Sequence, residues 1–265
     1  MYNYQDILIP PENQGASDSP ISIYETEMKA FNRSVEQLFD QKPDLCQLIP
    51  VMYQRQMTVR RVIQKGDRNH YVGLFASRIN QMMVPFESAL EKQACTNFES
   101  HPEIQAYRSQ PYAVRLLYAG KIRTVYPDFE LITTDQNILA DIRHETNTYK
   151  PLFRERCEAL EYYAEQRGMT YILMTDKMIR GQRLLNTQWL LSLAVGKATP
   201  NLTNAVWEWI HDLDRPTFGK LFHLTASYPQ VRCVLSCLAL DGHLAVDLDH
   251  PLREQRVCPS LNSEV

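Results

Sequence analysis

The spacing of hydrophobic residues changes along the chain, and each change predicts a new element of secondary structure. Residues 87–97 place apolar side chains at helical spacing and contain no Gly or Pro, so they predict a helix. Residues 113–119 are rich in large alternating side chains, which is typical of a strand, and Ala119-Gly120 predicts a turn. Residues 121–132 are expected to return as the second strand of a hairpin, interrupted by Pro127, and residues 138–143 to form a third strand.

A second helix and a fourth strand follow. A long helix is expected from Pro151 to about Arg167, where Gly168 is a good stop signal. Residues 170–174 predict a short strand, after which Asp176 is expected to cap a following helix. The order helix, three strands, helix, strand predicts an α/β fold with a compact core and a mixed sheet.

The C-terminal third has a different pattern. Helical segments are expected at residues 201–212, 217–227 and 231–240. Residues 240–248 contain Asp241-Gly242 between alternating apolar residues, and they predict a small hairpin. Three helices followed by a hairpin describe a winged-helix domain.

Four regions follow from these patterns. Residues 1–50 are expected to form an N-terminal arm and extension, because residues 1–20 are polar and rich in Pro, Asn and Ser. Residues 51–183 form the predicted α/β core domain, and residues 184–250 form the winged-helix-like domain. Residues 251–265 are polar and are expected to be a flexible tail.

Composition narrows the class of protein. The chain has 265 residues, of which 44% are hydrophobic and 22% are charged, as is ordinary for a globular protein. There is no run of 18 apolar residues and no recognisable secretory signal, so neither a membrane span nor export is expected. The six cysteines include no CxxC pair, which argues against a zinc ribbon or a dense disulfide framework and favours a reducing cytoplasm.

The net charge of −3 is unusual for a protein that holds DNA by charge alone. Any DNA contact must therefore come from a local patch or from a partner. Residues 55–70 are the best candidate for a patch that contacts phosphates, although the same charges also fit an ordinary solvated surface. The basic side chains of this segment are Arg55, Arg60, Arg61, Lys65, Arg68 and His70.

A small set of charged residues on the predicted core carries the candidate chemistry. Glu91 lies on the helix before the hairpin, and Asp128 follows Pro127 partway along the second strand. Asp141 and Arg143 are two positions apart on the third strand, so their side chains share a face. If these two strands are neighbours, Asp128 and Asp141 converge at one edge of the sheet. Carboxylates that close repel each other, and a hard cation such as Mg²⁺ relieves the repulsion and can activate water against a phosphate.

Each of these residues also has an ordinary structural explanation. An aspartate after a proline, such as Asp128, is most often a turn or cap residue. Glu87 and Glu91 are four positions apart and most often form a solvated helix face, while an arginine in a strand is usually a surface partner. Only their combination, in this order and on these elements, favours a functional site.

The succession of motifs resembles a known family. Pro127-Asp128-Phe129 followed by Ala140-Asp141-Ile142-Arg143 resembles the loose PD-(D/E)xK signature of restriction-like nucleases. The longer pattern is more specific: Phe86-Glu-Ser-Ala-Leu-Glu91, then Gln110-Pro111, Tyr126-Pro-Asp-Phe129 and the segment from Tyr162 to Thr175-Asp176-Lys177. Over about residues 50–185, this succession resembles the TnsA-type transposase endonuclease family.

The resemblance implies a fold, an activity and partners. It implies a restriction-endonuclease-like core that binds Mg²⁺, with Mn²⁺ as a substitute, followed by a small winged-helix domain. TnsA-type proteins cut the 5′ ends of a transposon. A TnsB-like integrase-type transposase cuts and joins the 3′ ends, and a TnsC-like ATPase regulator contacts the C-terminal domain. The chain is thus expected to act on transposon-end DNA in the bacterial cytoplasm, as one subunit of a cut-and-paste transposase.

Carried over by position, Glu91 is the helix carboxylate, Asp128 is the central metal ligand, and Asp141 completes the metal shell. Arg143 stands where the family usually has lysine. Arginine is larger, planar and always protonated, so this exchange is not conservative. The catalytic set implied by the resemblance is therefore Glu91, Asp128, Asp141 and Arg143, with Lys150 as another possible source of the cation.

Three interpretations stay open. The first is an active endonuclease subunit, and the second is a catalytically weak or inactive structural subunit that bridges the integrase and the regulator. The third is an unrelated restriction-like nuclease of defence or repair. Elsewhere, Cys233 and Cys237 are better explained as two small buried residues than as metal ligands, and Trp207 and Trp209 as core or partner-facing residues.

Overall fold

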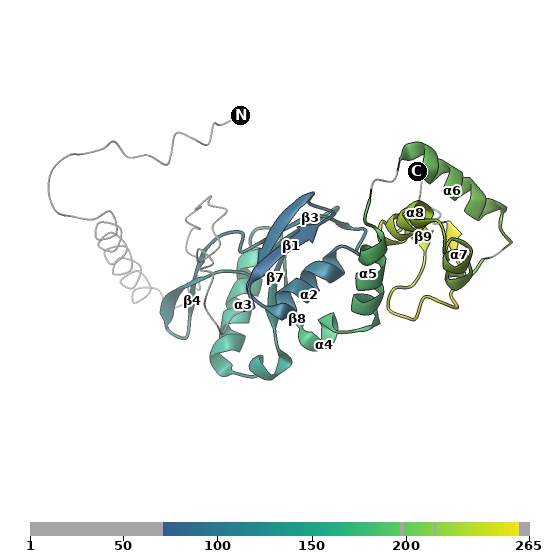
Figure 1. Cartoon of the computed structure of the whole chain (residues 1–265). Coiled ribbons are helices and arrows are strands. Elements are labelled where there is room, and N and C mark those ends of the chain that lie inside the picture. The colour runs from purple at the N-terminus through teal and green to yellow at the C-terminus, as the bar shows by residue number, and fades with distance from the viewer. Residues whose placement is uncertain (1–70, 197–198, 215, 260–265) are drawn as a thin grey trace, which may run out of the picture. The chain divides into compact units, whose positions relative to one another are not determined.

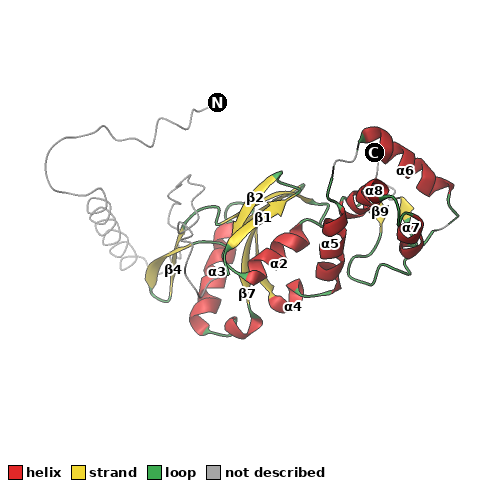
Figure 2. Ribbon diagram, in the orientation of Figure 1, coloured by secondary structure: helices red, strands yellow, loops and turns green. Residues whose placement is uncertain are grey.

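The computed structural model describes residues 71–196, 199–214 and 216–259, and all of them belong to one compact unit (Figure 1). The predicted N-terminal arm, and the basic side chains from Arg55 to His70, lie outside the described residues. Helices and strands alternate along residues 89–179, whereas residues 182–240 are mainly helical (Figure 2). The chain is therefore an α/β protein, as the hydrophobic pattern predicts.

A four-stranded mixed sheet forms the centre of the α/β core. In spatial order its strands are β3 (Ile104–Ser109), β6 (Phe129–Thr133), β7 (Asn137–Arg143) and β8 (Thr170–Thr175). β6 pairs antiparallel with both β3 and β7, and β8 runs parallel to β7. A parallel pair needs a crossover connection, and helix α3 (Pro151–Glu165) provides it. The predicted mixed sheet is confirmed.

The first strand of this sheet is not the predicted one. Residues 113–119 were expected to provide it, but β4 (Val114–Tyr118) and β5 (Lys121–Val125) form a separate two-stranded hairpin. Instead, β3 is the strand that pairs with β6 in the four-stranded sheet. Its sequence does not alternate regularly, because a bulge between Ile104 and Ala106 shifts the register against β6.

The expected return strand 121–132 is also divided. β5 ends at Val125 and β6 begins at Phe129, so the break contains Pro127. Proline has no N–H to donate to a ladder, which explains why pairing stops there. As a consequence, Asp128 lies immediately before β6 rather than partway along a strand.

Each face of the sheet is covered by one helix. Successive residues of a strand point to opposite faces. Ala140 of β7 therefore packs in the cluster that contains α2 (Ala89–Phe98), whereas Leu139 packs in the cluster that contains residues of α3. On the α2 side, the rings of Phe98 and Phe129 meet edge to face with centroids 5.4 Å apart.

A second hairpin, β1 (Gly73–Ser77) with β2 (Met82–Phe86), precedes α2 and was not predicted. It is tied to the end of α2 by Glu99, which is only 1% exposed. The Glu99 carboxylate accepts hydrogen bonds from four donors: Ser77 Oγ at 2.6 Å, the Tyr107 hydroxyl at 2.7 Å, and the backbone N–H groups of Arg78 at 2.9 Å and Ile79 at 3.0 Å. Hydrogen bonds to an ionised acceptor are strong, so this cluster anchors the hairpin.

The C-terminal part contains the three predicted helices. A 3₁₀ turn η1 (Glu145–Asn147) precedes α3, and after the sheet come α4 (Asp176–Ile179), α5 (Gln182–Leu193), α6 (Pro200–Asp212), α7 (Phe218–Leu224) and α8 (Pro229–Leu240). The expected domain boundary at residue 184 falls inside α5, whose Leu190 is buried in the same cluster as α6, α7 and α8. None of the helices in the described ranges is long and apolar enough to cross a membrane.

The expected hairpin at residues 240–248 is wrong. Asp241-Gly242 instead ends α8, because the Asp241 N–H donates to the Cys237 carbonyl at 2.8 Å and Gly242 adopts a φ of +74°. A glycine with positive φ is a common helix terminator. The short strand β9 (Leu244–Ala245) then pairs with β10 (Cys258–Pro259), far along the chain.

The pairing with β10 changes the interpretation of the predicted flexible tail. Residues 251–259 close the small sheet and contribute Leu252 and Val257, which are 5% and 2% exposed, to the C-terminal cluster. Their apolar side chains are separated by charged residues, so the segment has no regular hydrophobic period. The packed part of the chain therefore continues to β10.

The first turn of α7 lies unusually close to the loop that precedes β10. The Gly219 N–H donates to the Arg253 carbonyl at 2.9 Å, and a Cβ at Gly219 would lie 2.7 Å from that oxygen. Gly219→Ala should therefore lower the free energy of unfolding by about 1–3 kcal/mol, as overpacking does. Urea unfolding of this variant beside Lys220→Ala, which changes an exposed side chain in the same helix, measures the effect. Equal stability of the two variants would contradict the close approach.

Candidate functional site

The predicted acidic residues meet where β6 begins and β7 approaches its end. Phe129 of β6 pairs with Ala140 of β7, so Asp128 lies beside Asp141. The Asp128 N–H donates to Asp141 Oδ1 at 3.4 Å. The expectation that these two aspartates converge at one sheet edge is therefore met by the structure.

Asp128 forms an ion pair with Arg143. Arg143 Nη1 donates to Asp128 Oδ2 at 2.6 Å, and the Ile142 N–H donates to the same oxygen at 2.7 Å. The Asp128 side chain is 13% exposed and the Arg143 side chain is 32% exposed. Arg143 is thus the more accessible member of the pair and can meet an approaching anion.

Glu91 approaches this pair from the first turn of α2. Ser88 is the N-cap residue, and its Oγ accepts the Glu91 N–H at 3.1 Å. The Glu91 carboxylate accepts the Glu87 N–H at 2.7 Å and the Ser88 hydroxyl at 3.1 Å, so its position is fixed by the residues where the helix begins. Glu87 therefore precedes the helix, and the expected solvated face formed by Glu87 and Glu91 does not exist.

The charges around Glu91 and Asp128 influence the pKa values of both carboxyl groups. Burial raises the pKa of Glu91, and the charge of Arg143 partly opposes that shift. Burial also raises the pKa of Asp128, to about 7, while Arg143 lowers it. The negative charges of Asp141 and Glu91 raise the pKa of Asp128 further. The three carboxylates and Arg143 therefore form one interacting group.

Asp141 is held by residues that the sequence did not single out. Arg156 of α3 forms a two-pronged ion pair with the Asp141 carboxylate, and the Tyr171 hydroxyl of β8 donates to it at 2.8 Å. The Asp141 side chain is 0% exposed. Arg156 and Tyr171 belong to a helix and a strand far along the chain, and no motif connects them to Asp141, so spacing alone could not have identified them.

Phe153 brings the two arginines of the site together. The guanidinium carbons of Arg143 and Arg156 lie 5.8 and 5.7 Å from the centre of its ring. A cation over an aromatic face is attracted by the ring. Phe153 therefore helps to keep two like charges near the same three carboxylates.

The carboxylates of the site are candidate ligands of a metal ion. No cluster of three or more His, Cys, Asp or Glu side chains in the described residues is arranged to hold a metal ion. Glu91 and Asp128 offer two carboxylates, and Mg²⁺ commonly uses one or two together with water and phosphate oxygens. Asp141 differs from the expected ligand, because its oxygens face Arg156 and Tyr171.

The other residues of the expected pattern lie away from this group. Lys150 is exposed at the N-cap of α3. Lys177 Nζ pairs with Glu145 at 2.6 Å, and Asp176 accepts the Glu145 N–H at 2.8 Å. The expectation that Asp176 caps the following helix is wrong, because Asp176 is the first residue of α4 and the N-cap position belongs to Thr175, whose side chain makes no capping hydrogen bond. The Thr175-Asp176-Lys177 motif therefore joins the end of β8 to η1.

The C-terminal side chains of interest are structural. On α8, Cys233 is 4% exposed and Cys237 is half-buried. Trp207 and Trp209 are partly buried and pack against the C-terminal cluster. The burial of Cys233 agrees with the interpretation of a small buried residue, and the two tryptophans contribute to the core as one of their two interpretations predicts.

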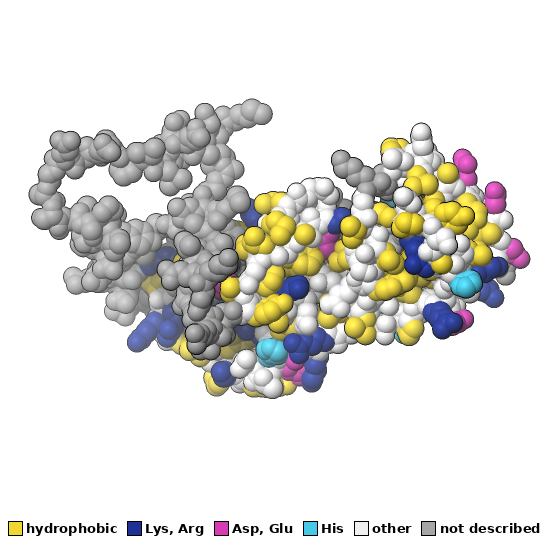
Figure 3. All heavy atoms as spheres, in the orientation of Figure 1, with side chains coloured by type: hydrophobic (Ala, Val, Ile, Leu, Met, Phe, Trp, Pro, Cys, Tyr) yellow, Lys and Arg dark blue, Asp and Glu magenta, His cyan; other side chains and the backbone are white. Residues whose placement is uncertain are grey.

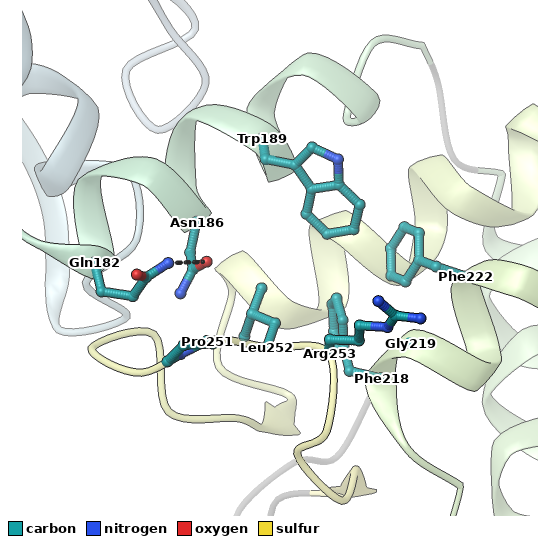
Figure 4. A pocket seen from close by; sticks show the side chains of 9 residues that line it. All are labelled: Gln182, Asn186, Trp189, Phe218, Gly219, Phe222, Pro251, Leu252 and Arg253. Atoms are coloured by element: carbon teal, nitrogen blue, oxygen red, sulfur yellow. Dashed lines mark hydrogen bonds between the residues drawn. The ribbon is translucent and has the colours of Figure 1, made fainter.

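The C-terminal part also contains an aromatic pocket of about 360 Å³. Trp189 of α5 faces Phe218 and Phe222 of α7 across it (Figure 4), and the ring centroids of Trp189 and Phe222 are 4.7 Å apart. The walls of the pocket are mainly apolar, and Arg253 is the one charged side chain among the described residues that line it. The lining residues are Gln182, Asn186, Trp189, Phe218, Gly219, Phe222, Pro251, Leu252 and Arg253.

Charged side chains are distributed rather than concentrated on the face drawn in Figure 3, where Lys and Arg lie among acidic and apolar groups. A broad basic field is therefore not a feature of this face of the described part. No protein-family model and no curated protein matches the sequence.

Asp128→Asn should change the pH dependence of stability. The ordinary pKa of this carboxyl is 3.8, and the folded chain raises it to about 7, so the stability that the group contributes is present at low pH and is lost as the pH rises through 7. Wild type should lose roughly 2–3 kcal/mol between about pH 5 and about pH 8 that Asp128→Asn keeps. Urea unfolding in EDTA measures this loss.

Asp135→Asn, in an exposed turn, is the matched control for removing one aspartate charge. It should follow the wild-type pH dependence. An Asp128→Asn protein that still loses stability like the wild type would show that the burial of Asp128 does not control this behaviour.

Proposed function

We propose that this chain is a divalent-metal-dependent DNA endonuclease, and that it serves as the TnsA-type subunit that cleaves the 5′ ends of a transposon. The observation that carries the proposal is the ion pair of Asp128 with Arg143 beside Asp141, with the charge of Glu91 close enough to act on both members of the pair. These residues come from α2, from the start of β6 and from the end of β7. Asp128 and Arg143, together with Asp141, lie in the segments that resemble the PD-(D/E)xK signature, and Glu91 lies in the longer pattern that resembles the TnsA-type family.

The order of elements supports the proposal. Without the inserted hairpin β4–β5, the core runs α2, β3, β6, β7, α3, β8, that is, one helix, three antiparallel strands, a crossover helix and a parallel strand. This order suits a restriction-endonuclease-like core. Similarly, the helices α6, α7 and α8 with the small β9–β10 sheet suit a winged-helix domain, which is our proposal for the C-terminal part.

Glu91 and Asp128 are the proposed ligands of Mg²⁺, for which Mn²⁺ can substitute. A bound divalent cation supplies an activated water and stabilises negative charge on the scissile phosphate. Within the described residues, Asp128 Oδ2 has two donors, and Oδ1 has none. Each Glu91 oxygen has one donor. Both side chains therefore keep lone pairs that face away from the protein donors.

Arg143 is the proposed phosphate-facing cation. An arginine does not lose its proton near neutral pH, so it cannot act as a general base there. Its planar guanidinium can instead make two parallel hydrogen bonds to phosphate oxygens. The 32% exposure of its side chain leaves it accessible to such a ligand. The proposed contribution of Arg143 is therefore electrostatic stabilisation.

The proposed setting is a heteromeric transposase in the bacterial cytoplasm. With a net charge of −3, the chain is expected to depend on a TnsB-like partner for much of the end recognition. The basic residues Arg55, Arg60, Arg61, Lys65 and Arg68 are proposed to add phosphate contacts, and the C-terminal part to contact a TnsC-like regulator.

A second candidate is a catalytically weak or inactive subunit that bridges these partners. The observation in its favour is the Arg143 contact to Asp128 Oδ2, since a bulky guanidinium beside the carboxylate competes with a cation for the same oxygen. The two candidates differ in whether the chain cuts DNA at all.

Asp128→Asn should lower 5′-strand cleavage by about 10²–10³-fold, the usual effect of removing a principal electrostatic stabiliser. The measurement is strand-specific cleavage of labelled transposon-end DNA by the full chain with its cognate integrase subunit, in Mg²⁺ and in Mn²⁺. Asp135→Asn is the matched control and should cut like wild type. Cleavage by the wild type should stop in EDTA.

Variants of Arg143 separate the two candidates. If the chain is active, Arg143→Ala should reduce 5′ cleavage about 10-fold or more. If wild type leaves the 5′ strands intact while the partner still cuts the 3′ ends, the inactive-subunit candidate replaces the proposal. Restored cutting by Arg143→Lys would then identify the arginine as the cause.

A further inference from the structure

The Asp141 carboxylate is fully enclosed, and each of its oxygens accepts two hydrogen bonds. Oδ1 accepts from Arg156 Nη2 at 3.2 Å and from the Asp128 N–H at 3.4 Å. Oδ2 accepts from Arg156 Nη1 and from the Tyr171 hydroxyl at 2.8 Å. The side chain is 0% exposed.

The number of donors decides what Asp141 can do. An ionised carboxylate has about four lone-pair positions, and four donors occupy all of them here. A metal ion would have to displace Arg156 or Tyr171 from an enclosed site. Removing one partner of a buried ion pair is strongly unfavourable, so this displacement is costly.

We propose that Asp141 is a positioning residue, held by Arg156 and Tyr171, which orients Asp128 for a divalent cation and is not itself a ligand of that cation. The inference rests on the proposed function, because it assumes that a cation binds at Glu91 and Asp128. It assigns Arg156 and Tyr171 a part in the site that neither the sequence nor the resemblance provides.

The route from Asp141 to Asp128 runs through the backbone. Asp141 Oδ1 receives the Asp128 N–H, and Arg156 Nη2 donates to the Tyr126 carbonyl at 3.5 Å. Between these two contacts lies Pro127, which is buried and has no N–H. The carboxylate of β7 and the guanidinium of α3 therefore hold both ends of the short segment from which the Asp128 side chain projects.

Small movements of this segment matter for chemistry. A displacement of about 1 Å in a reacting group can slow an enzyme about 10²-fold, even when the ligands of the site remain. Asp141→Asn keeps the shape of the side chain but changes one acceptor oxygen into a donor group. It should therefore loosen the Tyr126–Asp128 segment while Glu91 and Asp128 remain able to bind a cation.

The first experiment measures Mn²⁺ binding to the full chain without DNA, from the electron paramagnetic resonance signal of free Mn²⁺. Asp128→Asn should weaken binding about 10-fold or more, because it removes a ligand, whereas Asp141→Asn should stay within about 3-fold of wild type. Asp135→Asn is the control for loss of a distant carboxylate. Thermal unfolding and circular dichroism confirm that each variant is folded.

The second experiment measures 5′ cleavage by Asp141→Asn with the integrase partner at saturating Mn²⁺. We expect kcat to fall about 10–100-fold while the KM for DNA stays within about 3-fold of wild type. A general loss of folded protein would instead lower the active fraction and the Mn²⁺ stoichiometry together.

Three outcomes overturn the inference. If Asp141→Asn weakens Mn²⁺ binding as much as Asp128→Asn does, Asp141 is a ligand. If Asp141→Asn cleaves DNA like wild type, Asp141 has no positioning role. If Asp128→Asn leaves Mn²⁺ binding unchanged, the metal site of the proposed function fails, and the inference fails with it. Only this last result affects the proposed function.

Tyr171→Phe provides a milder variant if Asp141→Asn does not fold. It removes one hydrogen bond to Asp141 and keeps the ring in place. We expect unchanged Mn²⁺ affinity and a smaller loss in kcat, of about 3–10-fold, with unchanged KM. Wild-type kcat in this variant, or a loss of Mn²⁺ affinity like that of Asp128→Asn, would overturn the assignment.

Discussion

The ion pair between Arg156 and Asp141 is the interaction on which the rest of the site depends. Three carboxylates, Glu91, Asp128 and Asp141, share this end of the sheet, and burial raises the pKa of Glu91 and of Asp128. Arg156 neutralises the most enclosed of them from α3, while Arg143 neutralises Asp128 from β7. Without Arg156, an unpaired buried carboxylate would lie directly behind Asp128, and the segment that carries Asp128 would lose one of its attachments.

The fold explains why such a cluster is possible at this edge. Pro127 ends the pairing of β5, so that Asp128 stands free of a ladder immediately before β6. The alternation of β7 directs Leu139, Asp141 and Arg143 toward the face that α3 covers. Glu91 enters from the other layer, where its contacts with Glu87 and Ser88 fix the first turn of α2. The charged group is thus assembled from α2, α3, β7 and the residue that precedes β6.

Arginine at position 143 makes contacts that a lysine in the same place would not make. Its guanidinium contacts Asp128, the Ile142 carbonyl and the ring of Phe153 at the same time. A lysine ammonium, as a compact and strongly hydrated charge, would leave the aromatic contact weaker and Asp128 more accessible. The geometry therefore favours an electrostatic role for Arg143 and makes its competition with a cation the main determinant of activity under the proposed function.

The sequence by itself determined the α/β class, the mixed sheet and the helices α2, α3, α6, α7 and α8, because these follow from local periodicity. It predicted the convergence of Asp128 with Asp141 on the condition that their strands are neighbours, which β6 and β7 are. The hairpin β1–β2, the strand β3 and the helix α5 were not predicted. The sequence placed the first sheet strand at residues 113–119 and a hairpin at residues 240–248, and both were wrong, because strand pairing is decided by distant partners: β3 with β6 and β9 with β10. Only the tertiary structure decided that Asp141 faces Arg156 and Tyr171. Those side chains come from separate elements, and their contact depends on how α3 and β8 pack against β7, which no local spacing in the sequence records.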